Sequence, residues 1–155
     1  MTVDAEMVEE ELIAAVRLRL RELLPAADRE LGDEFARQYY RWVPLDDLRE
    51  RTPADLTGAV LSQWRLAANR KPGESKLKLG APDLERDGWE SPYTVLEIVV
   101  DDMPFLVDSV VMELTRSGYA THLVIHPVLA VKRDEQGDLV AIAQPGPKDQ
   151  FTVAL

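Results

Sequence analysis

Residues 94–110 constrain the fold of this chain more than any other stretch, because an apolar run ends at two aspartates and a proline then opens a helical pattern. The run is rich in Val and Ile, which favour β-strands. Pro104 is well tolerated at the start of a helix, where its missing N–H would be unpaired anyway. We expect Asp102 to cap this helix. A strand that turns directly into a helix leaves free backbone N–H groups at a sheet edge, where small ligands often bind.

Composition narrows the class of protein. A chain of 155 residues with 46% apolar residues is long enough for one domain or two small ones. Its formal charge of −10 argues against a nucleic-acid or anionic-membrane partner. It has no cysteine, which suits a reducing compartment. The first eleven residues are acidic and carry no basic residue, unlike a signal peptide, and no apolar run approaches the ~20 residues that a membrane helix needs. We expect a soluble, cytoplasmic protein.

Residues 1–71 have the spacing of amphipathic helices, and we expect them to form a helical subdomain. One helix ends near Pro25, a second covers about 28–42, and a short turn over 45–51 precedes a third. Thr52-Pro53-Ala54-Asp55 is a strong start signal for that third helix. The expected buried stripes are Leu12, Val16, Leu20 and Leu23, then Leu31, Phe35, Tyr39 and Trp42, then Leu56, Val60, Trp64 and Ala67.

Residues 72–92 are interrupted by glycines and prolines, so we expect a linker with one short strand over 76–79. Trp89 is expected to hold this linker against a sheet. Residues 93–155 change to a period of two, with strands over 94–100, 121–132 and 139–143 and a helix over 104–117. Pro127 cannot donate to a ladder, which places the second strand at a sheet edge. The fold class is therefore α+β, with a β-α-β-β order in the last third.

The sequence contains none of the common catalytic or cofactor motifs. Its glycines form neither a G-x-G-x-x-G nor a P-loop, and it has no nucleophile elbow or H-E-x-x-H. We therefore predict no catalytic residue, no cofactor site and no metal site. Asp101, Asp102 and Asp108 leave one alternative open, a small enzyme that uses a divalent cation on clustered carboxylates. Roles at the strand end and in the first turn of the helix explain these aspartates more simply.

Two groups of side chains are expected to be structural. His122 and His126 lie four residues apart on an expected strand, about 13 Å from each other, and Zn–N bonds of ~2 Å cannot bridge that distance. Both point away from the apolar face of that strand. The aromatic side chains of the helices are expected to form core rather than a ligand cage.

The junction also carries a resemblance. Asp102-x-Pro104-x-Leu106-Val107-x-x-Val110 is similar to the D-x-P-G-L-L-x-x-I turn of ACT domains, regulatory modules that commonly bind amino acids. A closer likeness joins Asp87-Gly88-Trp89, Ser91-Pro92, residues 94–110 and residues 122–127. Together these residues resemble the N-terminal region of the large bacterial NAD-specific glutamate dehydrogenases, in which an ACT-like domain follows a helical segment.

This resemblance implies a ferredoxin-like, ACT-type βαββ unit over 93–155. The unit is expected to be incomplete, because it lacks a second helix and a fourth strand unless 151–155 begins that strand. Phe105 stands where the ACT pattern has glycine, and its benzyl group crowds the approach to the helix N-terminus. Asp102, Met103, Pro104 and Phe105 are the candidate effector-binding residues.

The resemblance implies a non-catalytic regulatory or assembly domain, an N-terminal piece of an enzyme that converts glutamate to 2-oxoglutarate. NAD would bind elsewhere in that enzyme. The expected partners are its other domains or protomers, in a homo-oligomer, and an amino-acid effector. Two alternatives stay open: a stand-alone ACT-type amino-acid sensor that uses 102–105, and the small divalent-metal enzyme.

Overall fold

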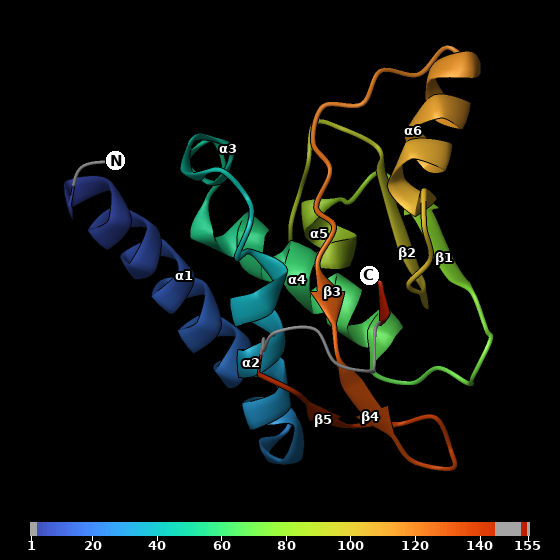
Figure 1. Ribbon diagram of the computed structural model, residues 1–155. Helices are drawn as coiled ribbons and strands as arrows, with labels where there is room; N and C mark the ends of the chain where they lie inside the picture. Colours follow the sequence, from blue (N-terminus) through green and yellow to red (C-terminus); the bar gives the residue numbers. More distant parts are fainter. Residues whose placement is uncertain (1–2, 145–152, 155) are drawn as a thin grey trace.

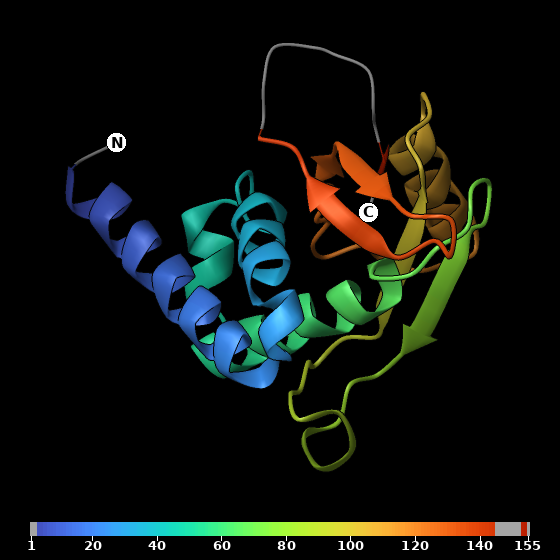
Figure 2. The same ribbon diagram turned by 90° about the horizontal axis from the view of Figure 1, so that it is seen from below.

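The computed structural model describes residues 3–144 and 153–154. Its N-terminal part is a group of helices (Figure 1), namely α1 (Val3–Leu23), the 3-10 turn η1 (Ala26–Asp28), α2 (Arg29–Tyr39), α3 (Leu45–Arg49) and α4 (Pro53–Ala67). Both α2 and α4 pack against α1. The helices expected from the apolar spacing of residues 1–71 are thus present, and α4 extends from the other helices toward the strands (Figure 2).

The helix α4 contributes one complete stripe of the expected core. Its four predicted stripe residues, Leu56, Val60, Trp64 and Ala67, are all buried. The predicted cap is also present, because the Thr52 hydroxyl accepts a hydrogen bond from the Asp55 N–H at 3.1 Å. Phe35 of α2 meets the Trp64 ring edge-on, with 5.4 Å between the ring centroids.

Two expected stripe positions are wrong, and both lie at helix ends. Leu23 is exposed and Leu24 is buried in its place, because Val16, Leu20 and Leu24 keep a spacing of four along one face. Trp42 is 77% exposed because α2 already ends at Tyr39. The chain has turned by residue 42, and Trp42 lies under the guanidinium of Arg41 at the surface.

The strands form two antiparallel sheets. The larger has the order β1-β2-β6-β3, with β1 (Lys76–Gly80), β2 (Val95–Asp101), β6 (Val153–Ala154) and β3 (Val128–Leu129). The smaller is the hairpin of β4 (Val131–Arg133) and β5 (Leu139–Ile142), joined by the loop 134–138. Between β1 and β2 lies α5 (Leu84–Asp87), and α6 (Leu106–Arg116) follows β2. The fold is α+β.

The strand order is that of a ferredoxin-like unit, except that β1 takes the place of the fourth strand. In such a unit the third strand lies between the first and the second, and the fourth lies on the other side of the first. Here β6 lies between β2 and β3, so residues 153–154 occupy the third-strand place rather than the fourth. Phe151, Thr152 and Leu155 lie outside the described residues. The fourth-strand place beside β2 is taken by β1, which comes from the region expected to be a linker.

The expected strand over 121–132 is only partly correct. Residues 121–127 have no regular hydrogen-bonded ladder with the described strands, and β3 and β4 together cover only 128–133 with a break at residue 130. The alternation of burial nevertheless persists, since Leu123, Ile125, Pro127 and Leu129 are less exposed than their neighbours. The side-chain period of an extended chain is retained without strand pairing.

The strand β1 turns its lysines toward α4 and its leucines away. Lys78 lies opposite Glu97 in the register, and both reach Ser62 of α4. The intervening Leu77 and Leu79 point to the opposite face and are 62% and 71% exposed. The helix α6 lies beside this part of the sheet (Figures 1 and 2), and none of its residues is buried.

Candidate functional site

The strand–turn–helix junction forms where the sequence predicts it, but with different roles for its residues. The strand β2 ends at Asp101 and α6 begins at Leu106, so Pro104 lies in the turn before the helix. Asp102 makes no capping hydrogen bond, which corrects the expected cap. The N-cap position belongs to Phe105, whose φ of 61° and ψ of 17° place it in the left-handed region.

Phe105 is unusual in the part of the chain that the structure describes. It is the one described non-glycine residue with a positive φ. This conformation costs an L-residue roughly 1–2 kcal/mol, which is why glycine suits such a position. The phenyl ring is 75% exposed, so burial of the ring does not offset that cost within this chain. Met103 of the same turn is also exposed.

Asp101 is held by a buried arginine. The guanidinium of Arg70, which is 3% exposed, donates from Nη2 to Asp101 Oδ1 at 2.5 Å and from Nη1 to the carbonyl of Glu74 at 2.7 Å. Arg70 therefore connects the end of α4, the start of β1 and the end of β2. The buried Nε of Arg70 has no hydrogen-bond partner among the described residues.

A second arginine lies near this centre. Arg133 of β4 donates to the carbonyl of Gly137 at 3.0 Å. Burial lowers the pKa of Arg133, and the positive charge of Arg70 lowers it further. The hairpin loop also touches Arg70 through its backbone, since a Cβ added at Gly137 would lie 2.7 Å from the Arg70 carbonyl oxygen. The Arg70–Asp101 ion pair and the contact of Gly137 with Arg70 thus connect the end of the α4 segment to both sheets.

The aspartates of the junction are not gathered for a cation. Asp101 is bound to Arg70, and across the described residues no group of three or more His, Asp or Glu side chains is placed to hold a metal ion. The metal-dependent alternative consequently gains no support from the geometry.

The two histidines lie on exposed positions of the extended segment before β3. His122 stacks on Tyr93 with 4.3 Å between the ring centroids and 23° between the planes. This contact joins the segment after α6 to Tyr93, which lies just before β2. His126 is exposed four residues further along the chain.

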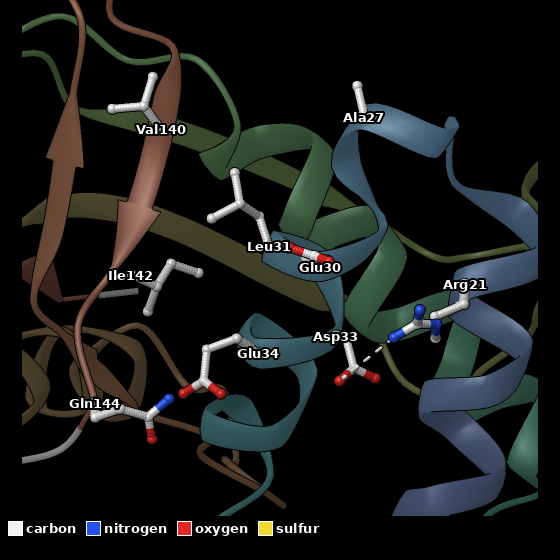
Figure 3. A pocket seen from close by; sticks show the side chains of 9 residues that line it. All are labelled: Arg21, Ala27, Glu30, Leu31, Asp33, Glu34, Val140, Ile142 and Gln144. Atoms are coloured by element: carbon white, nitrogen blue, oxygen red, sulfur yellow. Dashed lines mark ion pairs between the residues drawn. The ribbon is translucent and has the colours of Figure 1, made fainter.

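A groove of about 540 Å³ separates α2 from β5 (Figure 3). Leu31 points toward Val140 and Ile142 across it, and these three side chains form its apolar part. The polar lining consists of Arg21, Glu30, Asp33, Glu34 and Gln144. Glu30 forms no ion pair with the described residues, whereas Asp33 is bound by Arg17 at 2.6 Å. The lining is mainly acidic, which suits a basic group better than an anion.

Glu34 in this groove is held in its ionised form. Burial favours the neutral form, but hydrogen bonds from Arg37 at 2.7 Å and from Gln38 outweigh it and lower the pKa of Glu34. Arg37 also donates to Gln144 at 2.8 Å, and Gln38 donates to the carbonyl of Ala143 at 2.9 Å. Arg37 and Gln38 of α2 thus hold the end of the β-hairpin, and Glu34 holds these two side chains in place.

The sequence interpretation missed both the Arg70 centre and the α2–β5 groove. Arg70 was one of several cations after a helix, and nothing local distinguishes it from Lys71. The signal that could have been used was Glu97, an acid inside an apolar strand, which indicates that this face of β2 meets polar partners.

Comparison with known proteins places the chain in a family. The family model for the glutamate dehydrogenase ACT1 domain matches residues 35–154. The chain belongs to the glutamate dehydrogenase ACT1 domain family. That match covers the junction, the Arg70 centre and the described strands, but only part of the helical region.

The ACT1 chain is also similar to much longer proteins. It is 39% identical over 139 residues to an NAD-specific glutamate dehydrogenase of Halomonas elongata, which covers 90% of this chain and 9% of that protein. It is 39% identical over 132 residues to one of Pseudomonas aeruginosa, which covers 81% of this chain and 8% of that protein. The chain thus spans less than a tenth of the length of these relatives. No solved structure matches it significantly.

Among the residues that the structure describes, no helix is both long enough and apolar enough to cross a membrane.

Proposed function

We propose that this chain is a non-catalytic regulatory or assembly domain at the N-terminal side of an NAD-dependent glutamate dehydrogenase. The observation that carries the proposal is the match of the ACT1 family model to residues 35–154, together with a relative named NAD-specific glutamate dehydrogenase, of which the match covers only 9%. The whole enzyme would oxidise glutamate to 2-oxoglutarate with NAD in the cytoplasm. Its other domains or protomers would be the partners of this chain, within a homo-oligomer.

The absence of dinucleotide and nucleophile motifs from the sequence supports a non-catalytic role. The purified 155-residue chain is therefore expected to produce no NADH from glutamate and NAD. Measurable turnover in this assay would overturn the proposal.

The exposed leucines of β1 support the assembly role. Leu77 and Leu79 form an apolar face of a sheet on the side away from α4, and such faces are commonly covered by a partner. In a full-length dehydrogenase carrying this chain, Leu77→Lys with Leu79→Lys is expected to reduce the sedimentation coefficient or the activity. Leu18→Lys is the matched control, because Leu18 is equally exposed on α1. If both variants behave like the unchanged enzyme, the assembly role is wrong.

The regulatory role is tested separately through residues 102–105. An amino-acid effector that binds the N–H groups at the start of α6 should bind more tightly when Phe105→Gly removes the exposed benzyl group. Calorimetry with a panel of amino acids on both chains measures this. Silence across the panel in both chains ends the effector proposal and leaves the assembly role intact.

A further inference from the structure

A second cavity, of about 270 Å³, lies between α4, β1 and α5, and it shares no lining residue with the α2–β5 groove. One wall is a stripe of α4, and the other walls come from Lys78 of β1, Arg86 and Asp87 of α5, and Trp89. Neither the junction residues 102–105 nor the Arg70 centre line it. Nothing in the family match or in the names of the relatives assigns a role to it.

The cavity concentrates positive charge in a chain whose formal charge is −10. Three cationic side chains line it, from three different elements: Arg65, Lys78 and Arg86. Arg86 is compensated by Asp87 at 2.6 Å, and Lys78 is compensated by Glu97 at 3.3 Å. Arg65 forms no ion pair or side-chain hydrogen bond with any described residue. The two ion pairs are neutral, so the guanidinium of Arg65 leaves the cavity with a net charge of one positive unit.

The ammonium group of Lys78 is fixed by buried partners rather than left on a mobile chain. It donates to Ser62 Oγ at 2.6 Å, and Ser62 donates in turn to Glu97 Oε2 at 2.9 Å. Ser62 and Glu97 are each only 8% exposed. The Ser62 hydroxyl already accepts one hydrogen bond and donates another. The ammonium group of Lys78 has three N–H groups, so it keeps one for a ligand.

The remaining lining is apolar. Leu61 is buried, Leu66 is half-buried, and the indole of Trp89 packs directly on Gly58. A ligand that suits these walls carries one anionic group and an apolar body. A guanidinium binds a carboxylate through two parallel hydrogen bonds, and the apolar walls favour an organic carboxylate over an inorganic ion, which has no apolar body to bury.

We propose that the cavity between α4, β1 and α5 binds a small organic monocarboxylate. Its carboxylate is held by Arg65 and Lys78, and its apolar body lies against Trp89 and Leu61. Because the walls belong to the helical region and to the sheet, the bound carboxylate also stabilises the packing of α4 on β1.

The test uses the full 155-residue chain with benzoate as the probe, by calorimetry and by the indole N–H resonance of Trp89. We expect saturable binding at millimolar concentrations or below and a shift of the Trp89 resonance. Benzamide has the same shape without the charge and is expected to bind at least about tenfold more weakly, the loss that a charge-assisted hydrogen bond predicts. Equal binding of benzamide, stronger binding of inorganic phosphate, or no saturable binding of benzoate overturns the proposal.

Variants assign the site. Arg65→Ala is expected to weaken benzoate binding at least about tenfold, and Arg65→Lys by less, because lysine keeps the charge and loses the planar fork. Arg19→Ala is the matched control, since Arg19 is exposed on α1 far along the chain from this cavity. Arg65 is exposed, so an unchanged melting temperature without ligand shows that each variant is folded. Unchanged affinity in folded Arg65→Ala places the binding elsewhere and overturns the proposal.

Discussion

Arg70 Nη2 lies 2.5 Å from Asp101 Oδ1, and this pair joins the buried end of the α4 segment to the last residue of β2. One partner is almost fully buried and the other is half exposed, so the pair sits at the boundary between core and solvent. A buried cation that loses its acid is costly, because water cannot replace the lost partner.

Asp101→Asn is expected to lower the free energy of unfolding by about 1–3 kcal/mol. Urea denaturation measures this. Asp108→Asn is the control, because Asp108 is exposed on α6 and has no ion pair within the described part of the chain. The double variant with Arg70→Met should lose less than the sum of the two single losses, since it also removes the uncompensated charge. If the loss in the double variant equals the sum of the two single losses, Arg70 and Asp101 are not coupled.

Gly58→Ala is expected to destabilise the chain by roughly 1–3 kcal/mol, although alanine usually stabilises a helix interior relative to glycine. An added Cβ would lie 2.2 Å from Cβ of Trp89, so the indole must move. The same change in a Trp89→Gly background should be neutral or stabilising, because glycine removes the Cβ as well as the indole. Gly80→Ala is the control, because no heavy atom lies within 4 Å of its added Cβ. Thermal unfolding of the four variants tests this contact.

Substitutions at Phe105 are expected to rank by their tolerance of a positive φ rather than by size. Phe105→Gly should leave the free energy of unfolding unchanged within about 1 kcal/mol, because relief of backbone strain offsets the entropy that glycine gains on unfolding. Phe105→Val should be less stable than Phe105→Gly by roughly 1–2 kcal/mol. Met103→Gly, in the same turn without a positive φ, should only destabilise. If the stabilities of the Phe105 variants followed side-chain hydrophobicity instead, backbone strain at this position would be contradicted.

Glu34→Gln is expected to lower stability at neutral pH by about 1 kcal/mol or less, the size of a partly exposed ion pair. The pKa of Glu34 is lowered in the folded state, so its contribution is complete above the pKa of the unfolded chain. The contribution disappears as the pH falls through the folded pKa, and the two chains should then become equally stable.

Denaturant titrations at several pH values measure this difference. Glu30→Gln is the control, because Glu30 lines the same groove without an ion pair to any residue of the described ranges. A difference that grows toward acid pH would show that Glu34 is not held ionised by Arg37.

The helical part of the fold was predictable from local rules. The Thr52-Pro53 start of α4 and its buried stripe follow from capping chemistry and a period of 3.6, both of which act within a few residues. The error at Leu23 is a choice between two neighbouring leucines at a helix end, and the error at Trp42 arises because α2 ends at Tyr39, before the expected end at residue 42.

The sheet was predictable only in part, because strand partners lie far apart in sequence. Alternation identified β2, but it could not show that β1 would take the edge place beside it. The same limit applied to Trp89, which was expected against a sheet and packs on Gly58 of α4 instead.

The candidate site was likewise predictable only in part. The junction was visible as a motif, whereas its positive φ at Phe105 contradicts local preference and depends on the surrounding chain. Arg70 and Arg65 carry no local signal at all, since their neighbours in space come from β2 and from β1. The domain boundaries at residues 71 and 92 stay a prediction.

The central place of β6 has a consequence for how this chain is made. Residues 95–101 and 128–129 both pair with 153–154, so the two strands that flank β6 leave the ribosome well before the strand between them. Until then each presents unpaired backbone groups on its inner edge, the kind of edge that recruits other chains. Pairing of β1 with β2 needs only residues 81–94 between them, so it can protect the outer edge of β2 early. Nascent chains should therefore be most prone to aggregation before residues 153–154 have left the ribosome.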